Sequence, residues 1–177
     1  VWDFIEKKQI KKEKRDIVYV EVFQYRSFSI PVGTLKVEAE IVAHNKDLDM
    51  ALLKPRTDTK FAYVAKLYSI GKEDALLVFE ETVAVGCALG LPPIPTVGHI
   101  TRKGFLIDSK EFWMSSSPII FGNSGGAMFK ASTAELIGIP SMLASAGFTA
   151  ITHVGIFIPL HRVYVWLEEV KFGFIFK

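Results

Sequence analysis

The residues with the clearest capacity for chemistry lie in a short stretch, Phe121–Ala127, in which a serine stands among glycines. On a tight turn a serine can present its hydroxyl to a cleft, and glycines permit positive φ and let a substrate backbone come close. Consecutive main-chain N–H groups of such a turn can also point at one position, as a developing oxyanion requires. Ser124 is therefore a candidate nucleophile, although Gly, Asn and Ser also cluster in ordinary turns.

In a second stretch, Ala43–Lys54 (AHNKDLDMALLK), a carboxylate immediately precedes an apolar strand. This order predicts that Asp49 lies at the mouth of the strand with its side chain partly buried. A buried carboxylate needs hydrogen-bond donors, and a histidine N–H is one of them. The alternative is a turn acid that caps a strand.

Short strands would position these residues, because runs of β-branched and aromatic residues alternate with turn signals along most of the chain. Residues 34–42 alternate apolar and polar side chains, as a half-buried strand does. One amphipathic helix is predicted from about Leu160 to Lys171, directly after Pro159. This pattern favours an all-β barrel or sandwich. The other predicted strands are residues 17–23, 51–53, 75–78, 82–85, 98–101, 126–129, 135–139 and 155–158.

The composition excludes several classes of protein. The 177 residues are 50% apolar and 23% charged, which suits one medium domain or two small ones and excludes a disordered chain. A single cysteine excludes an internal disulfide framework, and no apolar run is long enough for a transmembrane helix. The net charge is +2, but Lys7–Arg15 holds six basic residues and one acidic residue. We expect this segment to be a solvated loop rather than a contact with nucleic acid or a membrane.

Taken in order, these stretches resemble the trypsin-like serine proteases of the chymotrypsin fold, in particular their disulfide-free HtrA/Deg-type branch. Asp49–Lys54 (DMALLK) resembles the strand that carries the aspartate of the triad, and Gly122–Ala127 (GNSGGA) resembles the segment around the nucleophile. Collinear matches at residues 83–90, 98–101, 135–139 and 155–159 extend the resemblance over about residues 35 to 170. It implies two six-stranded antiparallel β-barrels and a C-terminal helix. Residues 1–74 would form an incomplete first barrel and residues 75–177 the second barrel with the helix, together one protease domain.

The resemblance also implies roles for individual residues. Ser124 would attack the scissile carbonyl, the N–H groups of Gly122 and Ser124 would form the oxyanion hole, and Asp49 would orient the catalytic histidine. The expected substrate is a polypeptide, and no cofactor is needed. The four histidines are scattered and the cysteine has no partner, so no metal site is expected.

The substrate-binding residues implied by the resemblance carry no acidic side chain. A preference for Arg or Lys is therefore not expected, and a shallow site would favour cleavage after small or medium aliphatic residues. The alternative is that the apolar members simply fill the core. The implied residues are Pro118 and Ile119 at the base of the specificity pocket, Ser141 and Leu143 on the strand that pairs with substrate, and Gly155 in the pocket wall.

The positions of the histidines depart from the family pattern, in which the catalytic histidine precedes the aspartate by roughly 30 to 50 residues. His44 is the only histidine before Asp49, and it lies five residues away, where the family has no catalytic role. The other histidines follow Asp49, and the matching position falls just before Val1. We predict a serine endopeptidase whose histidine lies upstream of this chain. Two alternatives stay open: a catalytically inactive peptide-binding or scaffold module, and substitution by His44. Oligomeric state and compartment are left open, because a chain without disulfides suits the cytoplasm and the periplasm equally.

Overall fold

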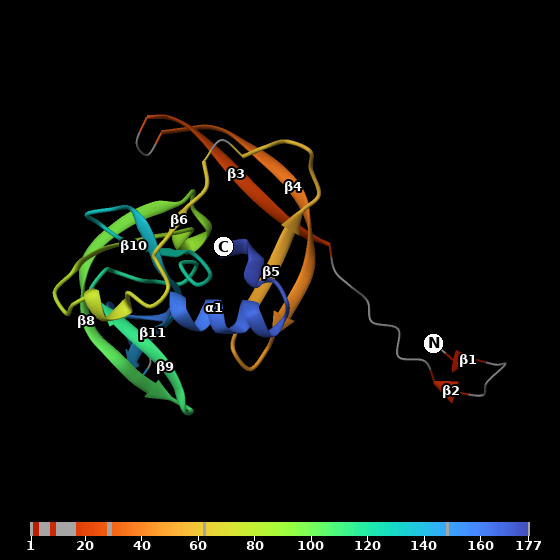
Figure 1. Cartoon of the computed structure of the whole chain (residues 1–177). Coiled ribbons are helices and arrows are strands. Elements are labelled where there is room, and N and C mark those ends of the chain that lie inside the picture. The colour runs from red at the N-terminus through yellow and green to blue at the C-terminus, as the bar shows by residue number, and fades with distance from the viewer. Residues whose placement is uncertain are drawn as a thin grey trace.

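Antiparallel β-sheet dominates the computed structural model (Figure 1), which describes residues 2–3, 8–9, 17–27, 30–61, 63–147 and 149–176. A two-stranded pair near the N-terminus joins β1 (Trp2–Asp3) to β2 (Lys8–Gln9). Apart from the backbone of β2, the basic segment Lys7–Arg15 lies outside the described residues, so its predicted role as a solvated loop stays a prediction.

The first large element is a three-stranded antiparallel sheet in which β4 lies between the other two strands. Along β4 the predicted alternation is confirmed only in the middle, where Val37 and Ala39 are buried while Lys36 and Glu40 are exposed. The apolar residues on either side, Leu35 and Ile41, are exposed. This sheet holds the three longest strands that the structure describes within residues 1–74, the region of the predicted first barrel. They are β3 (Val18–Ser27), β4 (Ile30–Asn45) and β5 (Met50–Pro55).

The second sheet closes on itself. Its strands follow the order β10-β7-β8-β9-β12-β11, and an additional pairing of β10 with β11 completes a six-stranded antiparallel barrel. A short strand, β6 (Lys66–Leu67), adds to β11 in parallel. The barrel strands are β7 (Glu81–Gly86), β8 (Ile94–Ile107), β9 (Lys110–Ser115), β10 (Ala127–Lys130), β11 (Glu135–Ala146) and β12 (Thr149–Pro159).

Two apolar clusters hold these parts together. One fills the barrel around Trp113 and Phe157, which are almost fully buried. The other, here called the inter-sheet cluster, joins the first sheet, the barrel and the helix α1 (Leu160–Glu169). Its buried members are Met50, Phe112, Ile156, Ile158, Trp166 and Leu167. The predicted helix is confirmed, and its buried face packs against both sheets.

Two local predictions were wrong. Residues 75–78 do not form a strand: the short helix η1 (Glu73–Ala75) and a turn replace it, and only Leu76 is buried. The strand β9 was not predicted, although it brings Phe112 and Trp113 into the two cores. Within the described ranges, no helix has the length and apolarity needed to cross a bilayer.

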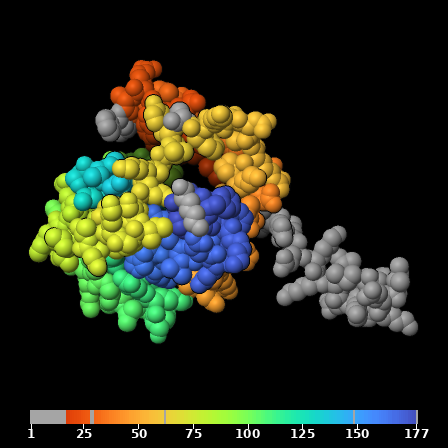
Figure 2. Space-filling model, viewed as in Figure 1, coloured from red at the N-terminus to blue at the C-terminus, as the bar shows by residue number. Residues whose placement is uncertain are grey.

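A cavity of about 720 Å³ lies between β4 and the residues that follow α1. Its lining includes Ala39, Ile41 and His44 from β4 together with Val170 and Phe172. In the space-filling view the molecule is hollowed between the orange three-stranded sheet and the blue C-terminal segment (Figure 2). The inner face of the first sheet is therefore only partly covered by the described residues.

Replacing Trp166 by alanine should destabilise the fold by about 3–5 kcal/mol, because Trp166 is 3% exposed and sits in the inter-sheet cluster. Val165→Ala is the matched control, since the neighbouring Val165 is 58% exposed and should cost under about 0.5 kcal/mol. Urea denaturation followed by circular dichroism measures both. Equal costs for the two variants would contradict this assignment of the helix face.

Candidate active site

The turn that carries Ser124 is fixed by main-chain hydrogen bonds on both sides. Asn123 is almost fully buried, and its N–H donates to the carbonyl of Ile120 at 3.1 Å. The N–H of Gly125 donates to the carbonyl of Pro140 on β11 at 2.8 Å. Ser124 itself is exposed. The turn therefore presents a serine hydroxyl to solvent from a main chain that is held in place.

Gly122 brings the turn into direct contact with the segment after β7. Its φ is +99°, and a Cβ atom at this position would lie 2.2 Å from the carbonyl oxygen of Cys87. Only glycine fits such a conformation and such a close approach. Within the described chain, the N–H groups of Gly122 and Ser124 have no acceptor. Both donors are thus free to meet a negatively charged oxygen.

Asp49 ends the turn between β4 and β5, directly before the strand as predicted. The turn is held by the Asn45 side chain, whose Oδ1 accepts from the N–H of Leu48 at 3.0 Å. The Lys110 ammonium, from the start of β9, also donates to the carbonyl of Asp47. The predicted partial burial of Asp49 was wrong, because its side chain is exposed.

Ser141 connects Ser124 with Asp49. Its main-chain carbonyl accepts a hydrogen bond from Ser124 Oγ at 3.1 Å, and its own hydroxyl donates to Asp49 Oδ2 at 3.0 Å. Ser141 can do both because the pairing of β11 with β12 shifts register between Pro140 and Met142, which leaves Ser141 out of the ladder. Sequence reasoning placed Ser141 on a substrate strand and missed its hydroxyl contact with Asp49, 92 residues away.

All four histidines lie in the described part of the chain, and none has a polar contact with Ser124 or Asp49. His44 is exposed on β4 and lines the cavity beside that strand. His99 and His153 are exposed on β8 and β12. The histidine donor that was predicted for Asp49 is therefore not among these residues, and Ser141 donates in its place.

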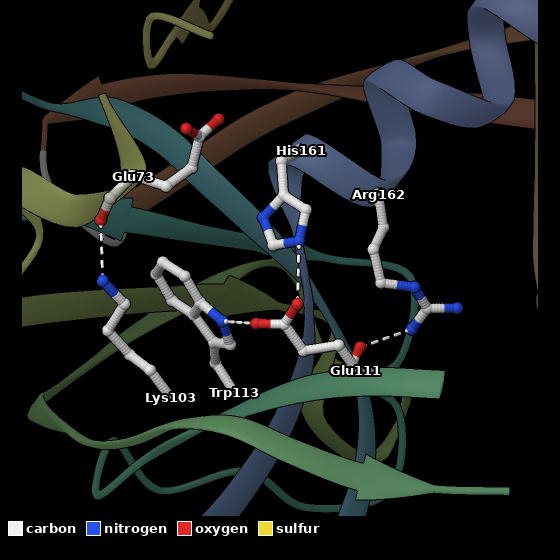
Figure 3. Close-up of polar contacts among 6 residues, drawn as sticks. All are labelled: Glu73, Lys103, Glu111, Trp113, His161 and Arg162. Atoms are coloured by element: carbon white, nitrogen blue, oxygen red, sulfur yellow. Dashed lines mark hydrogen bonds and ion pairs between the residues drawn. The ribbon is translucent and has the colours of Figure 1, made fainter. Parts of the chain in front are cut away.

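His161 belongs to a second polar cluster, at the start of α1 (Figure 3). The Glu111 carboxylate accepts from Trp113 Nε1 at 2.6 Å and faces His161 Nε2 at 3.2 Å. Arg162 donates to the carbonyl of Glu111 at 2.6 Å. Partial burial lowers the pKa of the Arg162 guanidinium, and the Glu111 carboxylate opposes this change. The cluster ties α1 to β9, and none of its residues has a hydrogen bond with Ser124 or Asp49 in the described part of the chain.

The predicted pocket residues differ in exposure. Ile119 is buried in the barrel core, where its side chain covers Gly155 so closely that a Cβ there would lie 2.3 Å from Ile119 Cδ1. Pro118 is exposed, and Leu143 is half-buried opposite Gly155 in the ladder of β11 and β12. Among the described residues no group of His, Cys, Asp or Glu could hold a metal ion.

The family described as a trypsin-like peptidase domain matches residues 11–139. The chain belongs to this family. A probable periplasmic serine endoprotease DegP-like of Buchnera aphidicola subsp. Schizaphis graminum is 33% identical over 144 residues, 78% of this chain and 29% of that protein. The magnetosome formation protease MamE of Paramagnetospirillum magneticum is 28% identical over 145 residues, 78% of this chain and 19% of that protein.

Solved structures agree with these relatives. The HtrA-type protease AlgW with a decapeptide superposes with a TM-score of 0.67 at 26% identity, covering 78% of this chain and 42% of that one. The predicted resemblance to HtrA-type trypsin-like proteases and the all-β fold are thereby confirmed. The trypsin-like chain spans under a third of these two curated relatives and under half of that AlgW chain.

Gly122→Ala should destabilise the trypsin-like fold by more than about 2 kcal/mol, because the new Cβ meets a fixed carbonyl as well as an unfavourable φ. Gly125→Ala is the matched control: Gly125 has φ +78° in the same turn, but nothing lies within 4 Å of its Cβ position. It should cost about 1 kcal/mol. Thermal and urea denaturation compare the two variants, and a smaller cost at Gly122 would contradict the close approach to Cys87.

Proposed function

We propose that the protein is a serine endopeptidase with Ser124 as nucleophile and Asp49 as the carboxylate of the triad. The observation that carries the proposal is the pair of hydrogen bonds through Ser141, which brings these two residues together. The relatives that are named serine endoproteases, or HtrA-type proteases, support the same class of reaction. The histidine that completes the triad comes from a part of the natural protein that precedes residue 1.

The proposed reaction passes through an acyl-enzyme. Ser124 Oγ forms a bond with the scissile carbonyl carbon while its proton passes to the histidine, and Asp49 stabilises the resulting imidazolium. The free N–H groups of Gly122 and Ser124 bind the negatively charged oxygen, each worth roughly 3–4 kcal/mol. The C–N bond then breaks, the histidine gives its proton to the leaving amine, and water hydrolyses the ester.

The proposed substrate is an extended polypeptide that pairs with β11. Beyond Gly138 the edge of β11 opposite β12 has no strand partner in the described chain, so Met142 and Leu143 offer main-chain groups to a peptide. Two AlgW structures contain a decapeptide or a tripeptide, which supports peptide binding by this fold. Pro118, Ile119, Leu143 and Gly155 are uncharged. We propose cleavage after small or medium aliphatic residues.

A second candidate is a peptide-binding module without catalysis. It is favoured by one observation: none of the four histidines contacts Ser124 or Asp49. Removing the general base leaves only a small part of the rate enhancement, while a free β11 edge would still bind peptide.

A fluorophosphonate probe should label Ser124 in the full-length gene product, and Ser124→Ala should abolish labelling, because the probe reacts only with an activated serine. Ser145→Ala, at an exposed serine further along β11, should be labelled like the wild type. Mass spectrometry of the labelled peptide locates the adduct. If the folded wild-type protein takes up no probe, the peptide-binding candidate replaces the endopeptidase.

Ser141→Ala should lower kcat by about tenfold with little change in KM, since a lost hydrogen bond to the Asp49 carboxylate affects the transition state by about 1.4 kcal/mol. The contact from Ser124 persists, because it goes to the main-chain carbonyl. Ser141→Thr keeps a hydroxyl and should restore most of kcat. Steady-state hydrolysis of an internally quenched peptide measures all three proteins. An unchanged kcat in Ser141→Ala would show that this hydroxyl does not support Asp49.

A further inference from the structure

The turn that carries Asp49 is only weakly closed by its own main chain. The N–H of Asp49 donates to the carbonyl of Lys46 at 3.3 Å, which is long for a hydrogen bond of this kind. Asp49 also has φ +55°, a left-handed conformation that is less favourable for an L-residue than the right-handed one. Its side chain is exposed, so burial does not fix it. We therefore expect contacts from outside the turn to contribute to the position of the Asp49 carboxylate.

The hairpin of β8 and β9 supplies such a contact. The two residues that connect these strands, Asp108 and Ser109, have φ of +48° and +61°, as in the two-residue turns that match the twist of a hairpin. This tight turn makes Lys110 the first residue of β9, and its ammonium donates to the carbonyl of Asp47. A side chain from the barrel thus binds the turn of the first sheet two residues before Asp49.

Apolar packing holds the hairpin and the turn beside the same core. Ile107, at the end of β8, and Leu48, directly before Asp49, are both partly buried, and both pack against the inter-sheet cluster. The contact from Lys110 is itself exposed, and an exposed hydrogen bond contributes little when it must order two mobile segments. Here the packing already holds both segments, so the contact orders little more than the Lys110 side chain.

The residue after Lys110 anchors the backbone from which this side chain extends. The Glu111 carboxylate accepts from Trp113 Nε1 and faces His161 Nε2, and the Glu111 carbonyl accepts from Arg162 (Figure 3). Successive side chains of a strand point to opposite faces, so these contacts with α1 do not compete with the contact from Lys110. The polar cluster at the start of α1 therefore supports the end of β9 that carries Lys110.

We propose that Lys110 is a positioning residue for Asp49. By holding the carbonyl of Asp47, it keeps the turn in the conformation that directs the Asp49 carboxylate to the Ser141 hydroxyl and to the catalytic histidine. Ser141 on β11 contacts Asp49 directly, and Lys110 on β9 holds its turn, so two strands of the barrel position one carboxylate of the first sheet. This inference rests on the proposed function and adds a residue outside the triad and the oxyanion hole.

Lys110→Met tests the proposal in the full-length protein, because methionine keeps an unbranched side chain and removes the donor. We expect kcat for an internally quenched peptide to fall about threefold to tenfold with little change in KM, since one lost hydrogen bond disturbs Asp49 in the transition state and leaves peptide binding intact. Lys110→Arg keeps a cationic donor and should restore most of kcat. Lys110 is not buried, so both variants should fold, and thermal denaturation checks this.

Lys46→Met is the matched control. Lys46 lies in the same turn and carries the same charge, but its ammonium makes no hydrogen bond or ion pair in the described chain. The substitution also leaves its main-chain carbonyl in place, so kcat should stay close to that of the wild type. An unchanged kcat in Lys110→Met, an equal loss in Lys46→Met, or a loss that Lys110→Arg does not relieve would overturn the proposal.

Hydrogen exchange separates this proposal from the endopeptidase. The N–H groups of Leu48 and Asp49 are bonded within the turn, so they should exchange about threefold to tenfold faster in Lys110→Met than in the wild type or Lys46→Met. A fall in kcat without faster exchange would overturn the proposal, since Lys110 would then not act through the turn. If Ser124 takes up no fluorophosphonate but exchange responds to Lys110, the hold on the turn stands and the endopeptidase is overturned. If Ser124 is labelled and neither kcat nor exchange responds, the hold is overturned and the endopeptidase stands.

Discussion

The hydrogen bond between Ser141 and Asp49 depends on apolar packing beside it on both strands, β5 and β11. Met50, which follows Asp49, belongs to the inter-sheet cluster, and Met142, which follows Ser141, is partly buried and packs against it. An exposed hydrogen bond contributes little by itself, because water competes for both partners. Burial of Met50 and of part of Met142 fixes the distance between the backbone segments that carry Asp49 and Ser141. The hydrogen bond between Ser141 and Asp49 follows from that distance. The chemistry at the surface thus rests on hydrophobic contact between a strand of one sheet and a strand of the other.

Closure of the barrel is the second constraint. β10 has only four residues, yet it pairs with β7 on one side and β11 on the other. The Ser124 turn leads directly into this strand, so the pairing of Ala127 with β7 and of Met128 with both neighbours limits where the turn can lie. Closure by β10 ends at Gly138, and beyond that residue the edge of β11 opposite β12 has no strand partner in the described residues.

The apolar–polar pattern of the sequence predicted elements correctly where one face of the element is buried and the other is exposed. The alternation in the middle of β4 and the amphipathic face of α1 are of this kind, and both were predicted. The pattern failed at Leu76–Phe79, where four successive apolar residues form a turn, and at β9, whose Phe112 and Trp113 are both buried, in different clusters. The link from Ser141 to Asp49 could not be predicted from spacing, because it depends on how two sheets pack. The prediction that Asp49 and Ser124 belong to one site came from the resemblance to a family and not from the periodicity of apolar residues.

The register shift at Ser141 makes the length of β11 matter more than its composition. Substituting Ser141 can remove its hydroxyl, but the carbonyl that accepts from Ser124 belongs to the main chain and survives every substitution. Deleting one residue between Pro140 and Met142 would regularise the ladder with β12 and withdraw both groups together. The site therefore depends on the number of residues in β11 as well as on their identity, because a change in the length of the strand moves both Ser141 groups, whereas a substitution of Ser141 removes only its hydroxyl.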